Sequence, residues 1–187
     1  MKHARPLVAA LAVVLSVAVV IFVAMGRTWW CKCGRPIPWS WDIWSMHNSQ
    51  HLMDAYTFSH IQHGFVFYGL FFLLLRRRSH LIRFTAALTL EAAWEILENT
   101  RFVIERYREA TISLDYFGDT ILNSLSDILA CAFGYGLAFL IPVWSSFLVF
   151  TLIELVMIYT LRDSLLINIL MLVAPLDAVR DWQMGGK

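Results

Sequence analysis

The feature that most restricts the fold of this sequence is the run from Leu7 to Met25, which contains 19 residues and no charge. A helix needs about 20 apolar residues to cross the ~30 Å hydrocarbon core of a membrane. A signal peptide is the competing interpretation, because basic residues precede the run. Signal peptides, however, have apolar cores of about 7–15 residues followed by a small-residue cleavage site, whereas this run ends in Met-Gly-Arg. We therefore expect an uncleaved membrane span.

The composition of the whole chain favours the same environment. The 187 residues are 59% hydrophobic and 16% charged, with a mean hydropathy of +0.62, whereas soluble domains have roughly 45–50% apolar and about 25% charged residues. The net charge of +1 gives no reason to expect a nucleic-acid partner. The sequence predicts an all-α, polytopic membrane helix bundle, folded as one integral membrane domain over residues 1–187.

Apolar runs of similar length recur along the chain. We expect five transmembrane helices, over residues 7–25, 57–75, 81–97, 119–141 and 143–161. Residues 164–179 are marginal in number for crossing the membrane, and they include Pro175 and Asp177. They predict a short C-terminal interfacial or half-inserted helix. Residues 98–118 predict a polar loop.

The distribution of basic and aromatic residues predicts the orientation. The arginines at 76–78 follow the second span directly, and short loops rich in Lys and Arg stay in the cytoplasm. The loop over residues 26–56 holds five of the eight tryptophans, and indole rings prefer the head-group layer. We expect a multi-pass protein of the bacterial inner membrane with a cytoplasmic N-terminus and this Trp-rich loop on the outer side.

Ionisable residues interrupt the expected spans at spacings of three or four, which place them on single helix faces. They are His60 and His63 in the second span, Glu91, Glu95 and Glu98 in the third, and Asp119, Asn123 and Asp127 in the fourth. Because successive spans run in opposite directions, Glu91, Asp127 and Glu154 lie roughly 10–12 Å deep in one leaflet. A charge at mid-membrane costs roughly 2.5–3.5 kcal/mol, so we expect these groups to face inward and meet.

Four interpretations of that cluster stay open. The first is a divalent metal site, since imidazole and carboxylate together suit such ions, although no HExxH motif occurs; the candidate ligands are His60, His63, Glu95, Glu98 and Asp119. The second is a site that binds or processes a membrane or envelope lipid, with catalytic candidates His60, His63, Glu95 and Asp127. Its ligand-binding candidates are His51, Asp54, Glu91, Arg108 and Asn123. The third is a proton or ion path, and the fourth is a purely structural polar network.

Smaller features carry simpler expectations. Cys31 and Cys33 could bind a metal, form a strained disulfide or stay as two free thiols, and Cys131 predicts a small packing residue. Gly134 and Gly136 predict close approach of a neighbouring helix.

The blocks NSQHLMDAYTFSHIQHGFVFY, EAAWEILENT, YFGDTILNSLSDI and LRDSLLINILML, with Trp182-Gln183, carry a resemblance. Together they resemble an uncharacterised family of small bacterial multi-pass inner-membrane proteins of unknown function. That resemblance implies a membrane topology and brings no activity, so whether the protein is an enzyme stays open.

More distantly, residues 57–140 resemble VanZ-like proteins, which are associated with glycopeptide resistance. That pattern has a His near the start of a span, an acid in the next span, an Arg before the following one, and D-x-x-x-N opening it. The matching positions here are His60 or His63, Glu91 or Glu95, Arg108, and Asp119 with Asn123.

Overall fold

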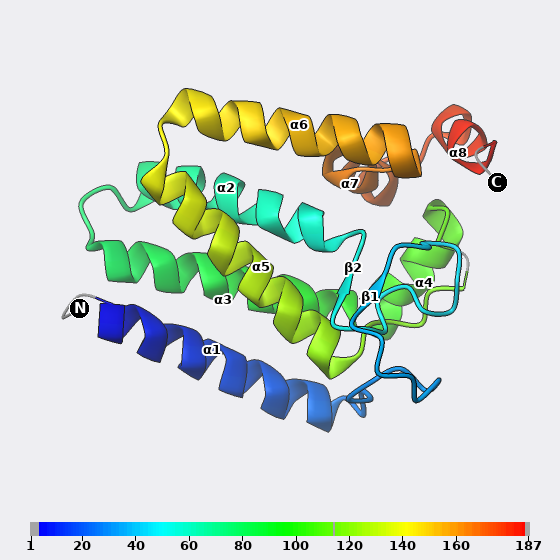
Figure 1. Ribbon diagram of the computed structural model, residues 1–187, viewed down its shortest axis with the longest axis horizontal. Helices are drawn as coiled ribbons and strands as arrows, with labels where there is room; N and C mark the ends of the chain where they lie inside the picture. Colours follow the sequence, from blue (N-terminus) through cyan, green and yellow to red (C-terminus); the bar gives the residue numbers. More distant parts are fainter. Residues whose placement is uncertain (1–3, 114, 186–187) are drawn as a thin grey trace.

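The computed structural model describes residues 4–113 and 115–185, which form eight helices and one pair of short strands (Figure 1). Five helices are long: α1 (Ala4–Ala24), α2 (Thr57–Leu74), α3 (His80–Glu98), α5 (Ile121–Leu140) and α6 (Val143–Leu161). Three helices are short: α4 (Arg101–Ala110), α7 (Leu165–Val173) and α8 (Asp177–Met184). The strands β1 (Trp39–Ser40) and β2 (Met53–Asp54) pair in parallel. The all-α prediction is confirmed.

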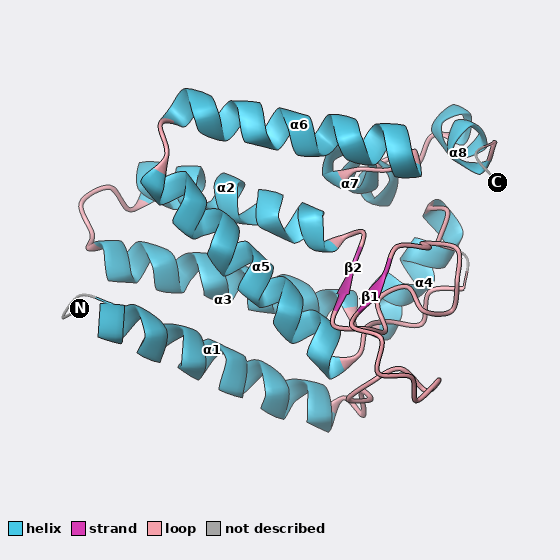
Figure 2. Ribbon diagram, viewed as in Figure 1, coloured by secondary structure: helices cyan, strands magenta, loops and turns pink. Residues whose placement is uncertain are grey.

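The long helices lie side by side, and the short elements gather at one end of the bundle, together with the loop over residues 26–56 (Figure 2). Helices α2 and α5 make the most extensive contact at the centre, with α3 against both, α1 packed on α3 and α5, and α6 packed on α2 and α5. The turn between α2 and α3 lies at the opposite end, next to the start of α1 (Figure 1).

Small hydroxyl residues begin four of these helices. The side chains of Ser79, Thr100, Thr120 and Ser164 each accept a hydrogen bond from a backbone N–H one turn into α3, α4, α5 and α7, respectively. Such caps satisfy N–H groups that the first turn of a helix leaves free.

Two details of the predicted organisation are wrong. Residues 98–118 are not a continuous loop, because Thr100 caps the ten-residue helix α4. The expected single helix over 164–179 is two helices, α7 and α8, and Pro175 lies between them, where its ring and missing N–H do not continue a helix.

The apolar character of the helices separates them into two groups. By length and composition, three described helices could cross a membrane: Arg5–Ala24 in α1, Ile121–Leu140 in α5 and Val143–Leu161 in α6. The other two predicted spans are present as the helices α2 and α3, but as membrane spans they stay a prediction.

Two glycines fix the contact between α2 and α5. A Cβ atom at Gly64 would collide with the backbone carbonyl oxygen of Cys131, and one at Gly134 with the carbonyl oxygen of Ile61. The expectation of close helix approach is therefore confirmed for Gly134. It is wrong for Gly136, where an added Cβ would meet no atom within 4 Å.

Candidate functional site

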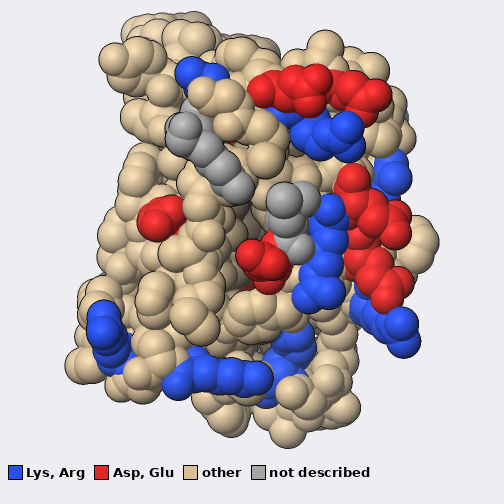
Figure 3. Space-filling view, turned by 90° about the vertical axis from the view of Figure 1, so that its right-hand side faces the viewer, with Lys and Arg blue, Asp and Glu red and all other residues tan. Residues whose placement is uncertain are grey.

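A small polar cavity lies where α2, α3 and α5 meet the loop end of the bundle. It has a volume of about 60 Å³, which is room for a few water molecules or one hydrated ion. Residues from α2, α3, α4, α5, α7 and the 26–56 loop line it. Figure 3 views this end of the molecule, where acidic and basic side chains gather along one side and most of the remainder is uncharged.

The buried carboxylate of Glu91 holds both imidazoles of α2. Nδ1 of His60 lies 2.6 Å from Glu91 Oε1, and Nδ1 of His63 lies 2.9 Å from Glu91 Oε2. A carboxylate on one ring nitrogen fixes the ring orientation and leaves the other nitrogen for chemistry. For His60 that other nitrogen, Nε2, lies 3.9 Å from Asp127 Oδ2, and both residues line the cavity.

Buried carboxylate oxygens of Glu95 and Asp127 lack hydrogen-bond donors among the described residues. Within residues 4–113 and 115–185, no donor reaches Oε1 or Oε2 of Glu95 or Oδ1 of Asp127. His60 Nδ1 lies 3.3 Å from Glu95 Oε1, but that nitrogen is already paired with Glu91. A buried carboxylate without donors is costly, so these oxygens call for a cation or a proton.

The carboxylate of Asp119 has a different environment. It accepts hydrogen bonds of 2.9 Å from Asn99 Nδ2 and from the Tyr116 hydroxyl. Asn99 Oδ1 in turn accepts the backbone N–H of Asp119 at 2.8 Å. Asp119 is therefore held in a fixed orientation at the wall of the cavity, where it lies close to Glu98.

Three overlapping groups of side chains have ligand atoms within 4.8 Å of one another, as a metal ion requires. They are His60, His63 and Glu91; His60, Glu95 and Asp127; and Glu95, Glu98 and Asp119. The second and third groups share Glu95, which could bridge two ions. Six carboxyl groups face two imidazoles here, namely Asp54, Glu91, Glu95, Glu98, Asp119 and Asp127 against His60 and His63. If all six carboxyl groups were ionised, two protonated imidazoles would not balance their negative charge.

The structure brings most of the sequence candidates together. Asp54 lines the cavity, but its carboxylate accepts the backbone N–H groups of Ser49, Tyr56 and Thr57, which is typical of a structural cap at the start of α2. The amide of Asn123 lies 3.4 Å from the same carboxylate.

Two ligand-binding candidates lie elsewhere. Arg108 is exposed on α4 and donates to the backbone carbonyl of Tyr116 rather than lining the cavity. His51 belongs to a separate cluster in the Trp-rich loop. The buried Glu154 of α6 pairs with Gln62 Nε2 at 2.9 Å and is also outside the cavity.

Several polar residues of the cavity were not predicted from the sequence. They are Tyr56, Tyr107, Tyr116 and Asn168. Burial raises the pKa of Tyr107 well above its ordinary value, and the neighbouring Glu98 raises it further, so the phenol stays a hydrogen-bond donor. Tyr107 and Tyr116 lie in the segment predicted as a loop. The available signal for α4 was Thr100, a helix-capping residue three positions before the apolar Val103.

The chain is similar to known proteins along nearly its whole length. A family model described as "Protein of unknown function (DUF2585)" matches residues 9–185. A UPF0314 protein of Rhizobium meliloti (strain 1021) is 51% identical over 92% of this chain and 87% of its own length. A UPF0314 protein of Sphingopyxis alaskensis is 43% identical over 96% of this chain and 95% of its own. No solved structure matches the chain significantly.

Proposed function

Because the chain belongs to the DUF2585 family of proteins of unknown function, its relatives supply no activity, and we propose a function from the polar cavity itself. The protein is an integral protein of the bacterial inner membrane that binds a divalent cation among its buried carboxylates. With that cation it acts on the head group of a membrane or envelope lipid. The membership of an uncharacterised bacterial family is confirmed, whereas the VanZ-like relation stays a prediction.

The membrane location is supported by what the outer helices expose. Val8, Val13 and Val20 of α1 are 62–68% exposed, and Phe147 and Tyr159 of α6 are 71% and 89% exposed. Soluble proteins rarely present apolar faces of this extent to water. Lipid chains would cover both faces, and α2 and α3, which lie alongside with similar lengths, would cross with them (Figure 1). The arginines at 76–78 then keep the α2–α3 turn and the N-terminus in the cytoplasm.

The cation is supported by the oxygens that have no donor. The carboxylates of Glu95 and Asp127 lie beside His60 in a group with ligand spacing. Helical bundles build metal sites in this way, from Glu, Asp and His on facing helices. A divalent ion would neutralise part of the buried charge and polarise a phosphate or carboxylate oxygen entering the cavity.

The chain's own groups supply the remaining roles. Glu91 fixes the ring of His60 through Nδ1 and leaves Nε2 available, as a general base or a metal ligand requires. The hydroxyls of Tyr107 and Tyr116 line the cavity and donate to Asn168 Oδ1 and Asp119 Oδ1, so they hold these polar groups in place around an entering ligand. The cavity volume of about 60 Å³ admits the reacting atoms of a head group and leaves the acyl chains in the bilayer.

The observation that carries this proposal is the set of buried carboxylate oxygens without donors on Glu95 and Asp127. It is tested by metal analysis of detergent-purified protein with the loop cysteines intact, and each variant is compared with the parent so that any metal held by the loop cancels. We expect Glu95→Gln and His60→Ala to lack a stoichiometric divalent metal that the parent contains. Glu154→Gln is the matched control, because it neutralises a buried acid outside the cavity, and it should retain the metal.

The lipid is tested separately. The purified protein in vesicles of phosphatidylglycerol and phosphatidylethanolamine, with the metal supplied, should convert or retain one lipid, detected by mass spectrometry, and His60→Asn should abolish this. If Glu95→Gln and His60→Ala contain as much metal as the parent, and Glu95→Gln is more heat-stable than the parent, the cluster is instead a structural network.

A further inference from the structure

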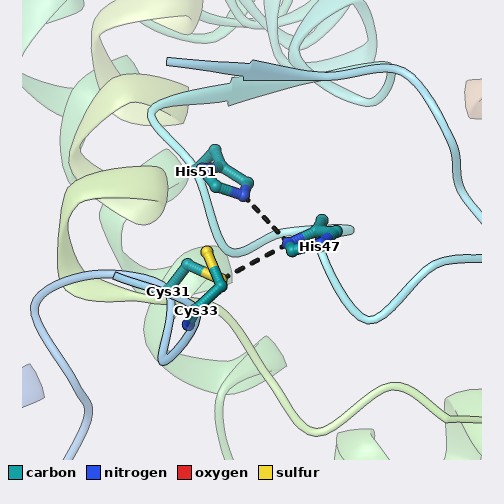
Figure 4. A group of neighbouring side chains, drawn as sticks. All are labelled: Cys31, Cys33, His47 and His51. Carbon is teal, nitrogen blue, oxygen red and sulfur yellow. Dashed lines mark hydrogen bonds between the residues drawn. The ribbon is translucent and has the colours of Figure 1, made fainter. Parts of the chain in front are cut away.

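A second group of metal-ligand side chains lies in the Trp-rich loop, outside the polar cavity. It consists of Cys31, Cys33, His47 and His51, whose ligand atoms all lie within 4.8 Å of one another (Figure 4). Cys31 and His51 are buried, and Cys33 and His47 are half-buried. The two thiols and the two imidazoles come from segments more than ten residues apart and point toward one another.

We propose that Cys31, Cys33, His47 and His51 bind one Zn²⁺ ion as a structural site. Two thiolates and two imidazoles are a common ligand set of structural zinc, and His47 and His51 have the usual His-x₃-His spacing. The described residues of the polar cavity offer carboxylates and imidazoles but no thiol, so thiolate coordination distinguishes this site from the cavity. This site does not depend on the function proposed above.

Two of the distances within the group fit the edges of a tetrahedron around zinc, and the remaining ligand atoms lie within 4.8 Å of one another. With Zn–S near 2.3 Å and Zn–N near 2.0–2.1 Å, the tetrahedral edges are about 3.4 Å between two nitrogens and about 3.6 Å between nitrogen and sulfur. His51 Nε2 lies 3.2 Å from His47 Nδ1, and Cys31 Sγ lies 3.5 Å from the same Nδ1. The two measured edges therefore agree with a coordinated ion to within about 0.2 Å.

The local backbone holds both thiols in this arrangement. A turn from Cys31 to Gly34 is closed by a 3.1 Å backbone hydrogen bond, and Gly34 has a φ of +67°, which favours glycine. The indole of Trp30 donates to the carbonyl of Arg35 at 2.9 Å and closes the same loop. The backbone N–H of Cys33 points at Cys31 Sγ, 3.3 Å away, and would stabilise a thiolate there.

The position of this zinc site gives it a role in shaping the polar cavity. Asn48 and Ser49, which lie between the two histidines, line the cavity. The carbonyl of Ser49 accepts the backbone N–H of Thr120, and the amide of Gln50 donates to the carbonyl of Gly118 at 2.9 Å. The loop has only two short strands of its own. The ion would therefore hold the loop in place over the start of α5.

Cobalt substitution tests the proposal in the full-length detergent-purified protein. Protein loaded with Co²⁺ should show thiolate-to-metal charge transfer and tetrahedral d–d bands, and X-ray absorption of the zinc form should show two sulfurs near 2.3 Å and two nitrogens near 2.0–2.1 Å. Cys33→Ser and His47→Asn should lose these signals. Cys131→Ser is the matched thiol control, because Cys131 is buried in α5 away from the group, and it should keep them.

Two further measurements make the test decisive. Glu95→Gln should leave the thiolate signal unchanged, which separates this site from the polar cavity. If the Cys33 and His47 variants do not fold, titrating the wild-type thiols with a mercurial should release about one zinc per chain, measured with a chromogenic chelator. A disulfide between Cys31 and Cys33 in anaerobically purified protein, or Co²⁺-loaded protein without any thiolate-to-metal charge transfer, would overturn the proposal.

Discussion

Replacing Gly134 by alanine tests the packing on which the polar cavity depends. The added methyl group at this position of α5 would collide with the carbonyl oxygen of Ile61 in α2. The obstacle is backbone, so no side-chain rotation relieves it and the two helices must separate. Gly64, whose own Cβ would meet the backbone of α5, offers no room on the other side of the contact.

The expected change in unfolding free energy is the sum of two opposing effects. Alanine gains about 1 kcal/mol over glycine in a helix interior, and overpacking against a rigid neighbour costs about 1–3 kcal/mol or more. The control is Gly136→Ala, two residues along the same helix, where a Cβ meets nothing within 4 Å. Helix propensity cancels between the two variants, so Gly134→Ala should be about 3 kcal/mol less stable than Gly136→Ala.

The assay is reversible unfolding in mixed micelles, followed by circular dichroism. Metal binding is measured on the same samples, because His60 is one turn from Gly64 and the separation would move it away from Asp127. Equal stability of the Gly134→Ala and Gly136→Ala proteins would refute the close contact of α2 and α5, and with it the geometry of the cavity.

Three further predictions follow from other contacts. Burial raises the pKa of Asp163, which accepts from the Tyr56 hydroxyl, to about 6. Since the folded state then holds a proton more tightly than the unfolded one, this residue should lower stability as pH rises from about 4 to 6. At about 1.4 kcal/mol per pKa unit the loss is roughly 3 kcal/mol, and Asp163→Asn should flatten that pH slope in thermal unfolding; parallel slopes would contradict it. Asn99→Ala should lower unfolding free energy by about 2–4 kcal/mol, because it removes a buried amide that donates to Asp119 and accepts from it; Asn99→Asp, which keeps the shape but places a carboxylate opposite Asp119, should be no better. Replacing the arginines at 76–78 by glutamine should weaken the orientation signal, so that a reporter fused after Ser79 no longer stays wholly cytoplasmic; an unchanged reporter would exclude these residues as the determinant.

The helices could be predicted from the sequence because apolar runs and capping residues are local signals. The start of α5 follows from Thr120, whose side chain accepts the N–H of Asn123. Helix α4 was missed because its charged surface resembles that of a loop. The break between α7 and α8 was missed although Pro175 marked it.

The contents of the polar cavity could be predicted only in part. Helical spacing joined His60 to His63 and Glu91 to Glu95, since neighbours on one helix face are fixed by its pitch. Which carboxylate meets which imidazole depends on how the helices are rotated about their axes. The contacts of Gly64 and Gly134 set this for α2 against α5, which carry His60 and Asp127. The grouping of Cys31 with His51 was not predictable, because loops have no period to read.

The small size of the polar cavity has a consequence for selectivity. A chamber of about 60 Å³ takes in one functional group and excludes the rest of any large molecule. Discrimination among lipids that carry the same terminal group would then be decided outside the chamber, by the residues at its rim. If the proposed function holds, variation between relatives that changes lipid preference should therefore be sought among the lining residues of α7 and the Trp-rich loop, and not among the buried acids.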